Sequence, residues 1–289
     1  MYTTREVQNT ILGIVKDIDR FCREQGITYY LMAGSALGAM RHQGFIPWDD
    51  DCDIFMTYEN YQRFLERFEG CCDTEKYFLQ RENTEEWPLY VSRVCLKGTT
   101  MISDEFRNNM RQHHNVFVDV MCLYSVPDNE LLHRIQYASA IFLRVNALAR
   151  CGFPNKNLLK RIALQLSKII VNPLTKPLLL SLVKRYEGQE TEAVASYFGR
   201  ARYRTASFPR SYLGKQRYVP FEDTTLPVME KAEEYLSFRY GSRWNEIPDQ
   251  KTRDQYPIHG NFVDLAKDYT EYMDASGTRW QYPEPDRKG

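Results

Sequence analysis

The sequence predicts an α+β fold. Helical and strand patterns alternate from residue 5 to residue 123, helical patterns dominate residues 130–200, and strand and turn patterns return at 206–223. Alternation of this kind is typical of α/β or α+β proteins, and we adopt α+β. The helical block reads as an insertion or a second lobe.

Each predicted element rests on a local pattern. Apolar residues at helical spacing, such as Val7, Ile11 and Ile18, indicate long helices at 5–25, 58–68 and 228–240. A short helix at 35–42 follows a turn at Gly34. Short apolar runs between turn residues indicate strands at 27–33, 51–56, 77–81, 89–102 and 115–123. The polar, Pro-rich segment 276–289 is expected to be mobile.

The composition limits the class of protein. The 289 residues suffice for one large domain or two modest ones, and 20 Tyr and 15 Phe among 43% apolar residues can build a core. The formal net charge is zero, so no overall field draws the chain onto nucleic acid, and we expect no nucleic-acid partner.

The cysteines and the apolar runs indicate where in the cell the protein is located. Seven cysteines without a CxxC pair indicate neither a zinc site nor a disulfide framework, which suits a reducing cytosol. The start, MYTTREVQNT, lacks the features of a signal peptide, and no apolar run of about 18 residues could span a membrane. We therefore expect a cytoplasmic protein.

The candidate active site is an acidic loop that enters an apolar strand. On a strand, Asp51 and Asp53 point to one face, and Cys52 and Ile54 to the other. Two such carboxylates would repel each other unless they share one or two hard cations, for which Mg²⁺ is expected and Mn²⁺ is the alternative. Asp119 is the only charge within the strand VFVDVMCL, and it would complete a three-carboxylate metal site if that strand lies beside 51–56.

The surroundings of this loop leave alternatives open. The whole run could be a solvated acidic turn, but the apolar residues on both sides argue against a free loop. Asp49 and Asp50 could orient the loop, bind Arg41 or touch substrate. Upstream, Gly34 and Ser35 offer a tight turn, a hydroxyl group and the N–H groups of a helix start to an anion.

The stretch GSALGAMRHQGFIPWDDDCDIFM (34–56) resembles the signature of the LicD family. The matching residues are Gly34, Ser35, Leu37, Gly38, Ala39, Arg41, Gly44, Phe45, Ile46, Pro47, Trp48, Asp49, Asp50, Asp51 and Asp53. Residues 116–129 resemble its third-carboxylate strand, although MCLYSVP replaces the usual aromatic-Pro step, and residues 218–248 resemble its Pro-Phe-Glu-Asp stretch. His259 stands near an expected histidine. The resemblance is weakest over 130–200.

This resemblance implies a nucleotidyltransferase-like mixed sheet with flanking helices. The expected division is a catalytic core at 1–129, a helical lobe at 130–200, a completing part at 201–275 and a flexible tail at 276–289. Enzymes of the family move a phospho-alcohol, often phosphocholine, from a CDP-linked donor to a hydroxyl of a cell-surface glycan such as lipopolysaccharide, teichoic acid or capsule. Asp51, Asp53 and Asp119 would be both the catalytic and the metal-binding residues. A nucleotidyltransferase that uses an NTP, or a non-catalytic scaffold, remains as an alternative.

Six further residues are candidates for substrate binding. Arg41 could contact a donor phosphate, and Arg93 and Lys97 alternate on one strand face where they could do the same. Glu222 and Asp223 could bind a headgroup or a sugar hydroxyl. His259 is either functional or structural. The alternative for Arg41 is a surface ion pair, and the alternative for Arg93 and Lys97 is a solvated strand face.

Residues 130–190 carry many bases and few acids. The acids are Glu130, Glu187 and Glu190, and the bases are Arg134, Arg144, Arg150, Lys156, Lys160, Arg161, Lys168, Lys176, Lys184 and Arg185. Mixed with Leu and Ile, they indicate a helix lying on an anionic membrane, which would place the protein at the inner face of the plasma membrane next to a lipid-linked acceptor. An ordinary solvated lobe or a dimer interface is the alternative.

Overall fold

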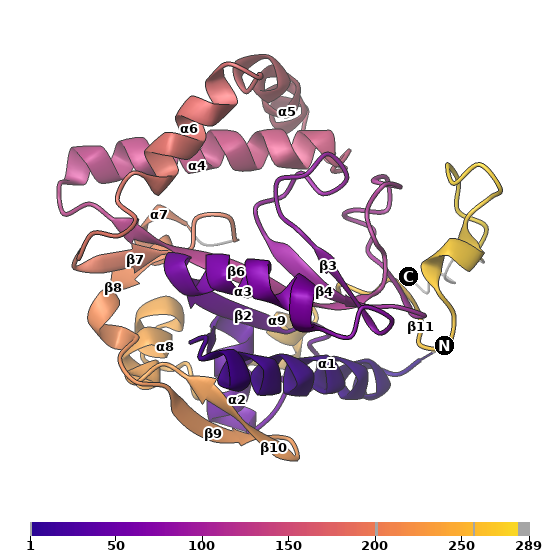
Figure 1. The fold of residues 1–289 in the computed structure, drawn as a ribbon, viewed down its shortest axis with the longest axis horizontal. Coiled ribbons are helices and arrows are strands. Elements are labelled where there is room, and N and C mark those ends of the chain that lie inside the picture. Colours follow the sequence, from indigo (N-terminus) through magenta and orange to yellow (C-terminus); the bar gives the residue numbers. More distant parts are fainter. Residues whose placement is uncertain (1, 200–201, 257, 283–289) are drawn as a thin grey trace.

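The structure, a computed structural model, describes residues 2–199, 202–256 and 258–282 (Figure 1). Its centre is a seven-stranded mixed sheet with the main strand order β1-β2-β6-β4-β3. These strands are β1 (Tyr30–Leu31), β2 (Asp53–Thr57), β3 (Tyr77–Gln80), β4 (Ser92–Leu96) and β6 (Val116–Val126). β7 (Ala193–Ala195) pairs with the far end of β6, and β8 (Ser207–Pro209) pairs with β7. The predicted α+β class is confirmed.

Strand β6 organises the sheet. It runs parallel to β2 on one side and antiparallel to β4 on the other. Its apolar side chains are buried along nearly its whole length, as expected for a central strand with helices packed around it. Two small antiparallel pairs lie outside this sheet: β9 (Arg217–Phe221) with β10 (Thr224–Val228), and β5 (Thr100–Ile102) with β11 (Phe262–Asp264).

The helices form two groups. Figure 1 shows α1 (Thr4–Gln25) and α3 (Tyr58–Cys71) alongside the strands, whereas α4 (Glu130–Arg150), α5 (Leu158–Ile170) and α6 (Thr175–Lys184) gather at the top of the view. A capping box between Thr3 and Glu6 begins α1, and its buried stripe includes Val7, Ile11 and Ile18. The other helices are α2 (Ala33–His42), α7 (Tyr203–Ala206), α8 (Ala232–Tyr240), α9 (Gln250–Arg253) and the 3₁₀ turns Arg210–Tyr212 and Tyr269–Tyr272.

Several predicted boundaries are wrong. The strand expected at 27–33 is confined to β1, because α2 already begins at Ala33 and includes Gly34. The run 89–102 is broken into β4 and β5 by a turn at Gly98, whose φ is 74°. The helical pattern does not reach residue 200, since β7 lies within that range. Of the tail, residues 283–289 lie outside the described residues.

The structure shows the state of the cysteines and whether any helix in the described part of the chain could span a membrane. All seven cysteines are free thiols, and five of them are buried as small apolar side chains: Cys22, Cys52, Cys95, Cys122 and Cys151. Among the described residues, no single helix has the length and apolar character to cross a membrane, whereas α5 and α6 meet the criterion together but are bent by 99° at their junction.

Helix α2 packs directly against the segment that leads to the acidic loop. A Cβ atom on Gly38 would lie 2.5 Å from the carbonyl oxygen of Gly44 and 3.2 Å from the amide nitrogen of Ile46. Both contacts are with backbone, so no side chain can move aside. Gly38 therefore sets the distance between α2 and residues 44–46.

Gly38→Ala is expected to lower the free energy of unfolding by about 1–3 kcal/mol through overpacking. Gly13→Ala is the matched control, because Gly13 also lies within a helix but a Cβ there meets nothing within 4 Å. That variant should gain up to about 1 kcal/mol from helix propensity. Chemical denaturation measures both, and equal stabilities would show that α2 does not make this close contact.

Candidate functional site

Asp53 and Asp119 lie side by side on neighbouring strands. They are register partners in the parallel pair β2–β6, and the amide of Asp119 donates a 3.0 Å hydrogen bond to the carbonyl oxygen of Cys52. Side chains of register partners project from the same face of a sheet. The strand of Asp119 thus lies beside β2, which meets the condition for a three-carboxylate cluster. Its role in binding a metal stays a prediction.

Asp51 precedes the strand. β2 begins at Asp53, so the strand alternation expected from Asp51 onward applies only from Asp53. Asp51 nevertheless lies close enough to interact with both acids. The charge of Asp119 helps to raise the pKa of Asp51, and the charge of Asp51 helps to raise the pKa of Asp53. The loop brings Asp51 to the cluster without being part of the sheet.

The acidic loop is held by buried and partly buried hydrogen bonds. The side-chain amide of Gln8, on the buried face of α1, donates to the carbonyl oxygens of Ile46 at 3.0 Å and Asp49 at 2.8 Å. The amide of Asp53 donates to the Ser35 hydroxyl at 2.8 Å. The loop is therefore not a solvated turn. The role of Gln8 in holding the loop was not predicted from the sequence. The available signal was a polar Gln next to Val7 on an otherwise apolar helix face.

Gly34 and Ser35 lie differently from the prediction. Both belong to the first turn of α2, and the positive φ of 52° falls on Ala33 instead of Gly34. A Cβ on Gly34 would lie 3.2 Å from Oδ2 of Asp49, so the glycine makes room for that carboxylate. The hydroxyl of Ser35 already accepts from the start of β2. Both residues thus shape the loop, and anion binding by them stays a prediction.

Asp50 anchors a segment from the far end of the chain. Its carboxylate accepts hydrogen bonds from the amides of His259, at 2.9 Å, and Gly260, at 2.8 Å, and lies 3.1 Å from Nδ1 of His259. Burial alone would raise the pKa of Asp50, but these hydrogen bonds outweigh it and lower the pKa. Asp50 therefore serves as a structural anion, and it does not bind Arg41.

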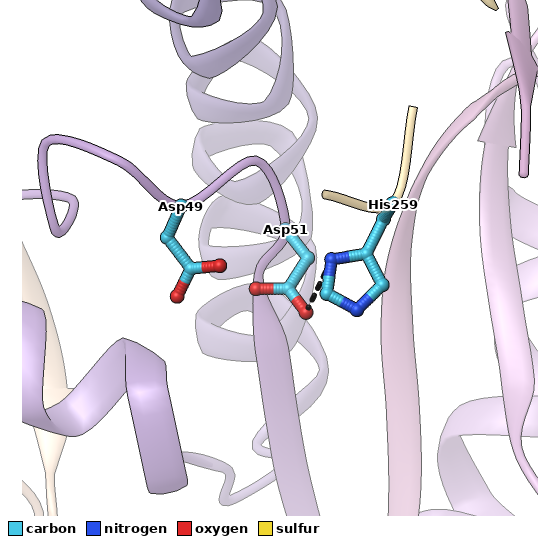
Figure 2. Close-up of side chains that lie close together, drawn as sticks. All are labelled: Asp49, Asp51 and His259. Carbon is cyan, nitrogen blue, oxygen red and sulfur yellow. Dashed lines mark ion pairs between the residues drawn. The ribbon is translucent and has the colours of Figure 1, made fainter. Parts of the chain in front are cut away.

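Asp49, Asp51 and His259 form a group that could hold a metal ion. One ligand atom from each lies within 4.8 Å of the others, and Nδ1 of His259 is 3.4 Å from Oδ2 of Asp51. Figure 2 shows the two carboxylates at the bend of the loop, with the imidazole next to Asp51. Asp51 is shared with the predicted set of Asp51, Asp53 and Asp119, whereas His259 supplies a candidate ligand atom that the predicted metal set lacked.

The cluster carries more negative charge than its surroundings neutralise. Burial, reinforced by the charge of Asp51, raises the pKa of Asp49 to about 8. Burial and neighbouring carboxylates also raise the pKa of Asp51 and bring that of Asp53 well above its ordinary value. Burial lowers the pKa of His259, but the hydrogen bond to Asp50 and the nearby acids outweigh it and raise the pKa to about 9. The imidazolium supplies one positive charge, and a divalent cation fits the remainder.

Arg93 pairs with Asp119. The two are register partners across β4 and β6, and Nε of Arg93 lies 2.8 Å from Oδ1 of Asp119. The guanidinium carbon lies 3.6 Å from the ring centroid of Phe117 and 4.3 Å from that of Trp87, so the charge is held in an aromatic setting. The solvated alternative for Arg93 is therefore wrong. The pairing with Asp119 was not predicted from the sequence.

Three other predicted site residues have partners away from the carboxylates. Lys97 donates to the carbonyl oxygen of Thr74, and Arg41 donates to the carbonyl oxygens of Trp244 and Glu246. Asp223 is exposed and pairs with Lys16 on α1. Arg41 therefore ties the segment after α8 to α2.

Glu222 fastens the turn after α2. Its carboxylate pairs with Arg5 and accepts from the amide of Phe45 at 3.1 Å, and its own amide donates to the carbonyl oxygen of Gln43 at 2.7 Å. A Cβ on Gly44 would collide with the Glu222 side chain. These contacts explain Glu222 structurally, and its predicted contact with a headgroup stays a prediction.

The sequence comparisons agree with the site. Residues 26–139 match the family model described as "LicD/FKTN/FKRP, nucleotidyltransferase domain". This part of the chain is therefore similar to the LicD nucleotidyltransferase domain. The match includes the acidic loop, Arg93 and Asp119, and it ends within α4.

The relatives differ in how much of the chain they cover. Over 267 residues the chain is 26% identical to "Lipopolysaccharide cholinephosphotransferase LicD" of Haemophilus influenzae, a match that spans 89% of this chain and 96% of that protein. Two uncharacterized proteins, from Rickettsia prowazekii and Rickettsia typhi, are 39% identical over 71 and 62 residues. Those matches span 24% and 20% of this chain and 27% and 20% of the relatives.

Asp50→Asn is expected to lower the free energy of unfolding by about 1–3 kcal/mol, because an amide cannot accept from every donor that faces Asp50. Hydrogen exchange at His259 and Gly260 should accelerate. Asp223→Asn breaks only an exposed ion pair and should leave stability nearly unchanged. If both variants behave alike, Asp50 is not the anchor of residues 259–260.

Cation binding is expected to displace protons. Asp49, with a pKa of about 8, is mostly protonated at neutral pH and must lose that proton to become a ligand. Affinity for Mn²⁺ should therefore increase as the pH rises towards 8. Titration calorimetry in buffers of different ionisation enthalpy measures the protons released, and binding that releases none at pH 7 would exclude Asp49 as a ligand.

Proposed function

We propose that this protein is a metal-dependent transferase. It moves a phospho-alcohol, with phosphocholine as the first candidate, from a CDP-linked donor to a hydroxyl of a cell-surface glycan. The observation that carries the proposal is the group formed by Asp49 and Asp51 on the loop and Asp53 at the start of β2, beside Asp119 on the adjacent strand. The similarity over 89% of the chain to a protein named as a lipopolysaccharide cholinephosphotransferase supports the headgroup and the acceptor class.

The residues present fit a hard divalent cation. Asp51 and Asp53 would hold it, with Asp49 as a further oxygen ligand, and carboxylate oxygens suit Mg²⁺ or Mn²⁺. Nδ1 of His259 faces both Asp50 and Asp51, and its raised pKa makes it a hydrogen-bond donor in the metal-free protein. When bound, the cation would neutralise donor phosphate oxygens and stabilise the leaving CMP.

The chain's own residues would then position the reactants. Arg93 holds Oδ1 of Asp119, which fixes the carboxylate beside Asp53. From there Asp119 would either bind the cation or accept the proton of the attacking glycan hydroxyl. His259 and Asp50 keep the segment after residue 258 against the loop. Gln8 and Ser35 keep the loop itself in place.

A second candidate keeps the site and changes the donor. The family model names a nucleotidyltransferase domain, which favours attack on the α-phosphate of an NTP. The two reactions release different products, CMP in the first case and pyrophosphate in the second. A protein that binds no divalent cation would instead support a non-catalytic scaffold.

Purified protein supplied with Mn²⁺ or Mg²⁺ should release CMP from one member of a panel of CDP-alcohols, with a glycan acceptor present. Asp51→Asn should lower this rate at least about 100-fold, because it removes a carboxylate charge that would hold the divalent cation at the donor phosphates. Asp104→Asn, an exposed residue that pairs with Arg107, is the control and should retain the rate. Normal turnover by Asp51→Asn would refute the assignment, and pyrophosphate release from an NTP would favour the second candidate.

A further inference from the structure

Helix α5 turns an apolar face to the outside. Its only buried residue is Ser167, and six of its apolar side chains are 46–76% exposed. They fall within about 120° of the helix circumference. The six, which we call the α5 face, are Leu158, Leu159, Ile162, Leu166, Ile169 and Ile170. Leu174, 87% exposed, and Leu178 extend this apolar surface to the junction with α6 and its first turns.

The exposure of this face is not caused by a loose helix. The Nδ2 atom of Asn146, on α4, donates a 3.0 Å hydrogen bond to the carbonyl oxygen of Ser167, and Val171 at the end of α5 is buried. The opposite side of the helix is thus fixed to α4. In Figure 1, α5 lies at the upper edge of the molecule, on the side away from α1 and the β9–β10 hairpin.

The charge around this face has one sign. Residues 131–186 contain no Asp or Glu and ten Lys or Arg, although the whole chain is formally neutral. Four of these bases flank or lie on α5 and are exposed: Lys156, Lys160, Arg161 and Lys168. An exposed apolar face bordered by cations complements the acyl chains and anionic headgroups of a membrane surface.

The length and shape of α5 favour lying on the membrane over crossing it. Its 13 residues rise by about 20 Å, short of the roughly 30 Å of a hydrocarbon core. α6 departs at 99° and packs against α4, with Val183 buried and its carbonyl oxygen bound by Gln136. Neither helix is free to complete a span with the other.

We propose that the α5 face docks this protein onto an anionic lipid surface. The apolar side chains enter the boundary between headgroups and acyl chains, and the lysines and arginines remain among the headgroups. In a cytoplasmic protein, as the sequence predicts, that surface would be the inner face of the plasma membrane. The proposal does not depend on the identity of the donor or acceptor, because it concerns a surface outside the carboxylate site.

Flotation of the full-length protein with vesicles tests this directly. We expect the protein to float with vesicles of phosphatidylglycerol and phosphatidylcholine, and at least about tenfold less with phosphatidylcholine alone, in a salt-dependent manner. Leu159→Glu with Ile169→Glu should abolish flotation, as these side chains are exposed and their replacement should preserve the fold. Lys160→Glu with Lys168→Glu should abolish the preference for anionic lipid.

The control is Ile247→Glu, which places one glutamate at an apolar side chain that is 61% exposed outside the helical block. It should float as the unmodified protein does. Circular dichroism checks that every variant is folded. Equal flotation of the α5 variants and the control would overturn the proposal. The proposal would also be overturned if the unmodified protein did not float but formed a dimer that the α5 variants dissociate.

Discussion

Repulsion among the carboxylates at the start of β2 is the constraint on which the rest of the structure depends. A loop that carries Asp49, Asp50 and Asp51 into a buried strand would open to water unless other elements held it closed. Gln8 from α1 and Ser35 from α2 bind the backbone of this loop. Gly38 lets α2 lie in van der Waals contact with the backbone of residues 44–46. The fold thus keeps acids together that would separate if they were free.

The acids divide into those with partners in the chain and those without sufficient countercharge. Asp50 is neutralised by His259 and two amides, and Asp119 by Arg93. Asp49, Asp51 and Asp53 are left with raised pKa values, which is the electrostatic condition of a cation site. The two pairs also orient the residues around that site. Structural and chemical roles are therefore distributed over adjacent acids of the same motif.

What could be predicted from the sequence was local. The helix at 5–25, the strand around Asp119 and the acidic motif follow from periodicity and composition within a few residues. The bonds of Asp50 to His259 and of Arg93 to Asp119 join residues 209 and 26 positions apart, so they depend on sheet register and chain return. Glu222 has a structural role that the sequence motif did not indicate, since its carboxylate fastens the turn after α2. Local patterns located the acidic cluster, but they did not indicate which of its acids are committed to structure.

The most direct test of the central inference is the position of a bound ion. Crystals grown with Mn²⁺ and measured at the manganese absorption edge would locate it by anomalous scattering. We expect a peak within coordinating distance of Asp51, with Asp53 or Asp49 as a second ligand and Asp50 still bound to His259. A peak elsewhere, or none at a saturating concentration of Mn²⁺, would contradict the cation site and leave the repulsion among these carboxylates unexplained.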